Sequence, residues 1–106
     1  MTLDEFLAWE REQPERHEFD GLVITEVTGA SLPHVVITMN TAFALRRALR
    51  GTGCRPFSSD AKVVAGGAIR YPDIVVSCRP YNEAVDIVPE PVVVIEIVSP
   101  TTERVD

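Results

Sequence analysis

The stretch PVVVIEIVSP, residues 91–100, decides the fold. Its nearly continuous apolar run predicts a central strand that is covered on both faces. Glu96 interrupts this run, and an unpartnered carboxylate is costly to bury. We therefore expect Glu96 to face a partner, a metal ion or solvent. Ser99 followed by Pro100 predicts the start of a further helix, because serine caps helices and proline favours their first turn.

A second acidic residue stands at the start of another predicted strand. Asp73 follows Pro72 and opens the apolar segment DIVV, residues 73–76. If the two strands are neighbours in one sheet, Asp73 and Glu96 can point into one cleft. Two carboxylates, with water molecules completing an octahedron, suit Mg²⁺ or Mn²⁺. The structural alternative is that Glu96 pairs with an arginine and Asp73 caps a loop.

Outward from these strands, helical and strand patterns alternate along the chain. A capping box at Thr2 and Glu5 begins the first helix, and glycine-containing turns at 20–21 and 66–67 join paired strands. The order helix, hairpin, helix, hairpin, central strand predicts an α+β fold. In chain order, the predicted elements before residue 91 are a helix over 3–12, two strands within 17–28, a helix over 34–50, and β-rich runs over 54–65 and 68–77.

Length and composition are those of one globular domain. The chain has 106 residues, of which 45% are hydrophobic and 25% are charged. No apolar run approaches the roughly 20 residues of a membrane span, and the acidic N-terminus lacks the basic region of a secretory signal. Two cysteines, Cys54 and Cys78, are too few for a disulfide scaffold, and we expect reduced thiols. These features predict a cytoplasmic protein without a membrane partner.

The charge of the chain is unevenly distributed. A net charge of −6 argues against a nucleic-acid partner, but residues 29–80 alone carry +5, from seven basic and two acidic side chains. Arg46, Arg47 and Arg50 crowd the end of the longest predicted helix. These three and Arg70 are candidates for binding DNA phosphates, although a charge run can also be a solvated face.

An ordered series of segments resembles the PD-(D/E)XK superfamily of metal-dependent nucleases. Within it, the chain is similar to the Uma-type family of restriction endonucleases, and the likeness covers essentially all 106 residues. The segments that carry it are MTLDEFLAW (1–9), HEFDGLV (17–23), SLPH (31–34), SSDAKV (58–63), YPDIVV (71–76) and VVIEIVSP (93–100).

The resemblance implies a restriction-endonuclease-like core of α-β-β-β-α-β order and a Mg²⁺-dependent DNA endonuclease. It implies that Asp73 and Glu96 are the catalytic acids and metal ligands, and that Glu18 is a further acidic residue of the catalytic site. The main-chain carbonyl of Ile97 would supply another hard oxygen ligand to the metal.

Two departures from the superfamily pattern leave other functions open. A lysine follows the second acid by two residues in the pattern, whereas Val98 stands there in this chain. Lys62, the only lysine, could substitute for it only by an accident of geometry. The family also continues with a helix and a strand, so residues 1–106 resemble an N-terminal portion of the domain. We expect an uncovered sheet edge and hence a homodimer or other self-association. A non-catalytic remnant and an α+β interaction module are the alternatives to an enzyme.

Overall fold

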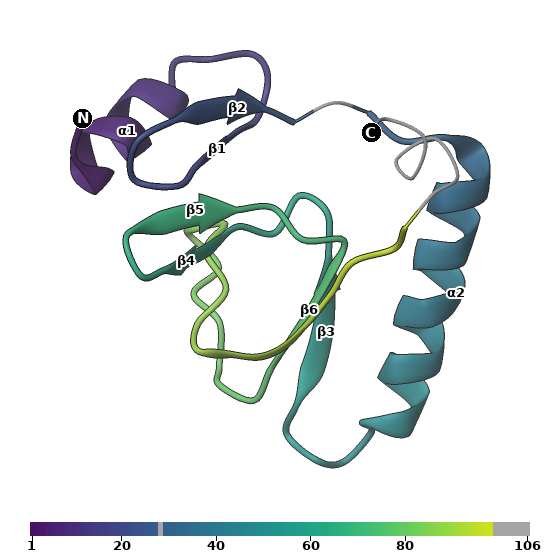
Figure 1. The fold of residues 1–106 in the computed structure, drawn as a ribbon. Helices are drawn as coiled ribbons and strands as arrows, with labels where there is room; N and C mark the ends of the chain where they lie inside the picture. Colours follow the sequence, from purple (N-terminus) through teal and green to yellow (C-terminus); the bar gives the residue numbers. More distant parts are fainter. Residues whose placement is uncertain (28, 99–106) are drawn as a thin grey trace.

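The computed structural model describes residues 1–27 and 29–98. In these ranges two helices and seven strands confirm the α+β fold (Figure 1). The elements are α1 (Leu3–Glu10), β1 (His17–Phe19), β2 (Ile24–Glu26), α2 (Leu32–Ala48), β3 (Arg55–Ser58), β4 (Val63–Ala65), β5 (Ala68–Arg70), β6 (Ile74–Ser77) and β7 (Pro91–Ile95).

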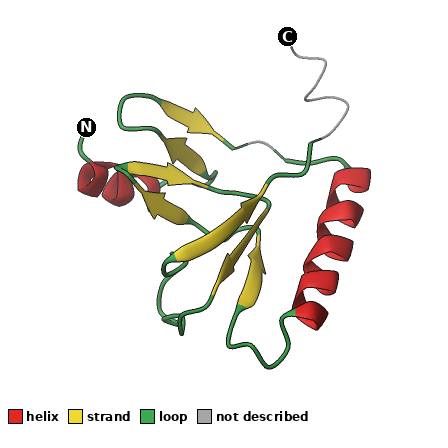
Figure 2. Ribbon diagram, turned by 60° about the horizontal axis from the view of Figure 1, so that its bottom comes forward, coloured by secondary structure: helices red, strands yellow, loops and turns green. Residues whose placement is uncertain are grey.

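The strands form two antiparallel sheets (Figure 2). One has the order β2-β1-β5-β4 and contains both predicted glycine-turn hairpins. The other has the order β3-β6-β7, in which β6 lies between its two neighbours. Each of the β-rich runs predicted over 54–65 and 68–77 is therefore divided between the two sheets. Helix α2 lies beside β3 and runs along the second sheet (Figure 1).

Local hydrogen bonds explain where the helices begin. At α1, the Thr2 hydroxyl accepts from the Glu5 N–H at 3.2 Å, and the Thr2 N–H donates to Glu5 Oε1 at 2.6 Å. Helix α2 begins at Leu32, two residues earlier than predicted. Ser31 is its N-cap and accepts from the His34 N–H. Proline is tolerated in a first helical turn, so Pro33 does not delay the start.

The buried core consists of two small clusters. Phe6, Phe19 and Ile69 pack together, and the two phenyl rings stack with centroids 4.9 Å apart. This cluster holds α1 against the four-stranded sheet. A second cluster joins Val63 of β4, Val75 of β6 and Val88. Helix α2 contributes no buried residue to either cluster.

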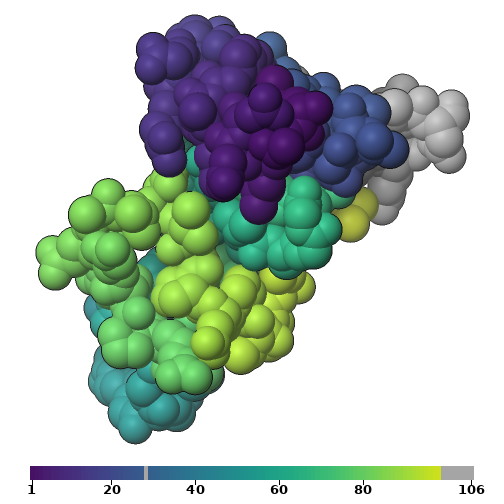
Figure 3. All heavy atoms as spheres, turned by 90° about the vertical axis from the view of Figure 1, so that its left-hand side faces the viewer, coloured from purple at the N-terminus to yellow at the C-terminus, as the bar shows by residue number. Residues whose placement is uncertain are grey.

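The expectation that the last strand is covered on both faces is wrong for the described residues. Val92, Val93 and Val94 are 60%, 47% and 52% exposed, and β7 is an edge strand of its sheet. The yellow-green atoms of the segment that contains β7 are visible at the surface in Figure 3. An apolar pattern shows that a strand can be covered, but it does not specify the covering element. This exposed apolar surface supports the predicted self-association, which stays a prediction. The predicted helix start at Ser99 and Pro100 lies outside the described residues.

The two cysteines are not reduced thiols as predicted. Cys54 and Cys78 form a disulfide across the ends of β3 and β6. The pairing of Arg55 with Ser77 brings the two cysteines opposite each other, and their separation of 24 residues gave no sign of it. None of the helices in residues 1–27 and 29–98 is long and apolar enough to cross a membrane.

Candidate active site

Two of the predicted acids meet at one end of the β3-β6-β7 sheet. Ile74 of β6 pairs with Ile95 of β7 in antiparallel register, so Asp73 and Glu96 flank the paired strands at the same end. The Ile97 N–H donates to Asp73 Oδ2 at 2.7 Å. This bond ties the segment after β7 to the residue before β6. The prediction that these two strands are neighbours in one sheet is therefore confirmed.

The electrostatics of Glu96 are consistent with the opposed positions of the two carboxyl groups. Partial burial raises the pKa of Glu96, and the negative charge of Asp73 and a hydrogen bond with its carboxyl group raise it further. The charge of Glu18 also raises the pKa of Glu96, whereas the charge of His34 opposes this rise without cancelling it. The site thus concentrates negative charge, and protonation of Glu96 or a bound cation would relieve it.

The third predicted acid, Glu18, lies on β1 in the other sheet. Its Oε2 atom accepts a hydrogen bond of 2.8 Å from the main-chain N–H of Tyr71. Tyr71 precedes Asp73 by only two residues, so this bond holds Glu18 beside the segment that carries Asp73. The structure therefore brings together all three acids named from the sequence.

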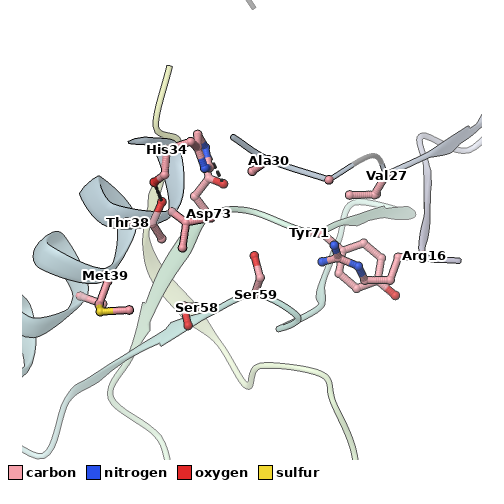
Figure 4. Close-up of a pocket in the computed structure, with 13 residues that line it drawn as sticks. Arg16, Val27, Ala30, His34, Thr38, Met39, Ser58, Ser59, Tyr71 and Asp73 are labelled. Carbon is pink, nitrogen blue, oxygen red and sulfur yellow. Dashed lines mark hydrogen bonds and ion pairs between the residues drawn. The ribbon is translucent and has the colours of Figure 1, made fainter. Parts of the chain in front are cut away.

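His34 also belongs to this site and was not predicted to do so. It lies in the first turn of α2, and its Nε2 atom is 3.2 Å from Asp73 Oδ1. Both side chains are largely buried, at 15% and 19% exposed. Figure 4 shows the imidazole facing the carboxylate across the top of a pocket. The segment SLPH (31–34) was the available signal, since it was among the stretches that carried the family resemblance.

The pocket beside Asp73 has a volume of about 450 Å³ and opens between α2 and the Tyr71–Asp73 segment (Figure 4). Arg16 lies on its far wall, where its Nη1 atom is 2.7 Å from Asp60 Oδ1. The Arg16 guanidinium also lies over the Tyr71 ring, 5.5 Å from the ring centroid. Arg16 is thus a cation close to the site that the sequence did not single out.

Comparisons with known proteins bear on the family and the fold of the chain. Residues 3–106 match the Uma2 family, which is described as "Putative restriction endonuclease". The chain belongs to this family.

Two relatives extend the comparison. The "Uncharacterized protein slr1290" of Synechocystis sp. (strain ATCC 27184 / PCC 6803 / Kazusa) is 34% identical over 110 residues, covering 100% of this chain and 57% of that protein. A crystal structure from Anabaena variabilis ATCC 29413, described as "a putative nuclease belonging to DUF820", superimposes with a TM-score of 0.75. It is 26% identical, and the match covers 95% of this chain and 60% of that one. The chain therefore spans somewhat more than half the length of these relatives.

Asp73 and Glu96 of this Uma2-family protein offer carboxylate oxygens at one end of the sheet. Carboxylate oxygens are the ligands that Mg²⁺ prefers, and the ion often takes only one or two carboxylates while it keeps several water molecules. In residues 1–27 and 29–98 no group of three or more His, Cys, Asp or Glu side chains is arranged to hold a metal. A bound ion would therefore rest on Asp73, Glu96, the Ile97 carbonyl and water. Such an ion would remove the repulsion between Asp73 and Glu96 that contributes to the raised pKa of Glu96.

Lys62 does not stand in for the lysine that the superfamily pattern places after the second acid. Its side chain is buried, and Nζ donates to Glu10 Oε1 at 2.6 Å. Nζ also lies 3.6 Å from Asp86 Oδ2. Lys62 therefore belongs to a separate buried network, and the position of the pattern's lysine is taken by the exposed Val98.

The arginines proposed from the sequence as phosphate ligands do not gather at the acids. Arg46, Arg47 and Arg50 line a second pocket at the C-terminal end of α2, whereas His34 lies at the N-terminal end. Arg70 uses Nη1 to donate to two main-chain carbonyls, those of Phe19 at 3.0 Å and Ile69 at 3.2 Å. The acidic site and the arginine cluster of this protein thus lie in two separate places.

Proposed function

We propose that this protein is a Mg²⁺-dependent endonuclease that hydrolyses phosphodiester bonds of DNA, with Mn²⁺ as a substitute ion. The observation that carries the proposal is the pairing of Asp73 with Glu96 at one sheet end, with the pKa of Glu96 raised, in a member of a restriction endonuclease family. Perturbed pKa values of clustered acids are typical of functional sites.

Asp73 and Glu96 would hold the ion, together with the main-chain carbonyl of Ile97. A divalent ion bound there supplies Lewis-acid activation of water and neutralises the charge that develops on phosphate. Asp73 is fixed for this role by two contacts, because Ile97 N–H holds Oδ2 and His34 Nε2 lies against Oδ1. Contacts of this kind orient ligand groups and are needed for full affinity.

Glu18 is the candidate for handling a proton. Tyr71 N–H occupies its Oε2 atom, and no hydrogen bond within the described residues engages Oε1. Oε1 would accept a proton from the attacking water, as a general base does. The pocket of about 450 Å³ beside Asp73 gives room for the phosphate and its sugars.

A second candidate function is DNA or protein binding without catalysis. It is favoured by one observation: among residues 1–27 and 29–98 the only lysine is buried with Glu10. A lysine that stabilises transition-state charge commonly contributes about 10²–10³ in rate, so its loss from the site weakens the case for catalysis.

Cleavage of supercoiled plasmid separates the two functions. We expect the wild type to nick DNA in Mg²⁺ or Mn²⁺ and not in EDTA, and Glu96→Gln to lower the rate by about 10²–10³. Glu26→Gln is the matched control, because Glu26 is an exposed acid on β2. Equal cleavage by the wild type and Glu96→Gln, or no cleavage by a wild type that binds Mn²⁺, would contradict the nuclease proposal.

A further inference from the structure

The second pocket of the molecule is lined by arginine and by no acidic residue. It has a volume of about 370 Å³ and lies where α2 ends and the chain turns into β3. The basic residues on its walls are Arg46, Arg47, Arg50 and Arg55. In a chain with a net charge of −6, four positive charges around one hollow form a distinct local field.

These four arginines differ from the basic residues that are held in ion pairs. Arg16, Lys62 and Arg79 are each paired with a carboxylate at 2.6–2.8 Å. In the described part of the chain, no ion pair or side-chain hydrogen bond involves the guanidinium groups of the pocket. Their positive charge therefore remains available to a ligand.

Aromatic rings fix part of this cluster in place. The Arg47 guanidinium lies over the Phe43 ring at 5.8 Å from its centroid, and that of Arg55 lies over the Tyr81 ring at 5.2 Å. Stacking of this kind restrains the guanidinium while leaving its N–H groups free to donate. Because the planar guanidinium matches phosphate bidentately, an arginine-lined pocket without acids suits a phosphate group.

Helix α2 connects this pocket to the acidic site. His34, which contacts Asp73, lies near the start of α2, and Arg46 follows it by twelve residues of continuous helix. That separation corresponds to about 18 Å along the helix axis. Base pairs are spaced about 3.4 Å apart along the duplex axis, so a duplex lying along α2 would span about five base pairs between the two sites.

We propose that the pocket of Arg46, Arg47, Arg50 and Arg55 binds the backbone of duplex DNA about five base pairs, along the duplex axis, from the phosphate held at Asp73 and Glu96. This inference rests on the proposed function, because it takes DNA as the substrate. The pocket gives affinity and fixes the orientation of the duplex along α2, and it takes no part in bond cleavage. Its contacts are to phosphate, so they do not depend on DNA sequence.

Fluorescence anisotropy with a labelled duplex of about 20 base pairs, measured in EDTA, tests this inference without any need for cleavage. Arg46→Ala/Arg47→Ala should weaken binding about tenfold or more at low salt and reduce the slope of log K against log salt by about two. Arg11→Ala/Arg79→Ala, which removes the same charge from other exposed positions, should change affinity less than about twofold. Arg46→Lys/Arg47→Lys keeps both positive charges and should restore the salt slope. Such recovery would show that the alanine variant loses affinity through loss of charge at these positions.

Every outcome of this experiment decides the proposal. Equal losses in the two alanine doubles would show that only net charge matters and would overturn it, as would a wild type that does not bind duplex DNA. Inorganic phosphate should displace the duplex more strongly than a chloride salt of equal ionic strength. That result would support a phosphate site. If the wild type binds DNA through these arginines but does not cleave it in Mg²⁺, the pocket stands and the nuclease proposal fails.

Discussion

Two carboxylate clusters lie on either side of Tyr71, and they are built in opposite ways. Glu10 is buried on α1, where Oε1 accepts from Lys62 Nζ at 2.6 Å and Oε2 accepts from the Tyr71 hydroxyl at 2.5 Å. Burial acts to raise the pKa of Glu10, but the hydrogen bonds from Lys62, Tyr71 and the His17 N–H outweigh it and lower the pKa. At Glu96, burial and the charge of Asp73 act together and raise the pKa.

The difference separates a structural carboxylate, Glu10, from one that we propose to be functional, Glu96. Glu10 has all the donors that a buried charge needs, so its network holds elements of the fold together. In the described residues no lysine or arginine pairs with Asp73 or Glu96, and the proposed cation would supply the positive charge. Tyr71 joins the two clusters, because its hydroxyl binds Glu10 while its main-chain N–H binds Glu18. The structural network therefore sets the position of the segment that leads to Asp73.

Removing the cation of the Glu10 cluster should have the largest effect on stability. Lys62→Met leaves a buried carboxylate without its charged partner, which typically costs about 3–5 kcal/mol of unfolding free energy. Urea unfolding followed by circular dichroism measures this loss. Glu10→Gln/Lys62→Met, which removes both charges, should recover part of it. A Lys62→Met protein within about 1 kcal/mol of the wild type would remove the contrast between the clusters.

A smaller effect is expected from Tyr71→Phe, which touches only one of the two clusters. The change removes the hydroxyl that donates to Glu10 and keeps the main-chain N–H that donates to Glu18. Loss of a hydrogen bond to a charged group costs about 1.5–3 kcal/mol. Under conditions where the protein stays folded, its Mn²⁺ response should equal that of the wild type. A loss of the metal response with full stability would show that the hydroxyl serves the acidic site instead.

The smallest stability change, and one of opposite sign, is expected at Glu96. The pKa of Glu96 is higher in the folded state than in the unfolded state, where it is about 4.3. The stability that this shift contributes is fully present below the unfolded pKa and is lost as pH rises through the folded pKa. Glu96→Gln should therefore be more stable than the metal-free wild type at pH 7. Because Glu96 is substantially exposed, we expect a gain below about 1 kcal/mol.

Thermal melts in EDTA from pH 4 to 8 measure this difference. The gap between Glu96→Gln and the wild type should widen as pH rises, whereas Glu26→Gln should follow the wild type throughout. The lowered pKa of Glu10 has the opposite pH dependence. Its contribution to stability is lost as pH falls through the folded pKa of Glu10. A Glu96→Gln protein that is less stable than the wild type at pH 7 would mean that Glu96 has a structural partner.

The contrast also shows which features were accessible from the sequence. The cap at Thr2 depends on hydrogen bonds within three residues, and the local pattern predicted it, whereas the cap at Ser31 was missed. The placement of Asp73 and Glu96 followed from strand alternation and from the resemblance to a nuclease family. The expected cover on β7 was wrong, because an apolar pattern does not reveal whether a partner element is present.

Contacts between distant segments were not predictable from local patterns. Glu10 and Lys62 are 52 residues apart, and neither a charge pattern nor a motif connects them. His34 reaches Asp73 only because α2 packs beside β3, which itself pairs with β6. The arginine pocket likewise required Arg55 to join the helical arginines through the turn between α2 and β3. Tertiary packing, set by the strand register, supplied these partners.

A thermal melt with and without Mn²⁺ tests most directly whether Asp73 and Glu96 form a cation site. An ion that binds only the folded state at a hundredfold excess over its Kd adds about 2.7 kcal/mol of stability. We predict that millimolar Mn²⁺ or Mg²⁺ raises the melting temperature of the wild type and of Glu26→Gln, and leaves that of Glu96→Gln unchanged. An equal response of the wild type and Glu96→Gln would contradict the presence of a metal site at these acids.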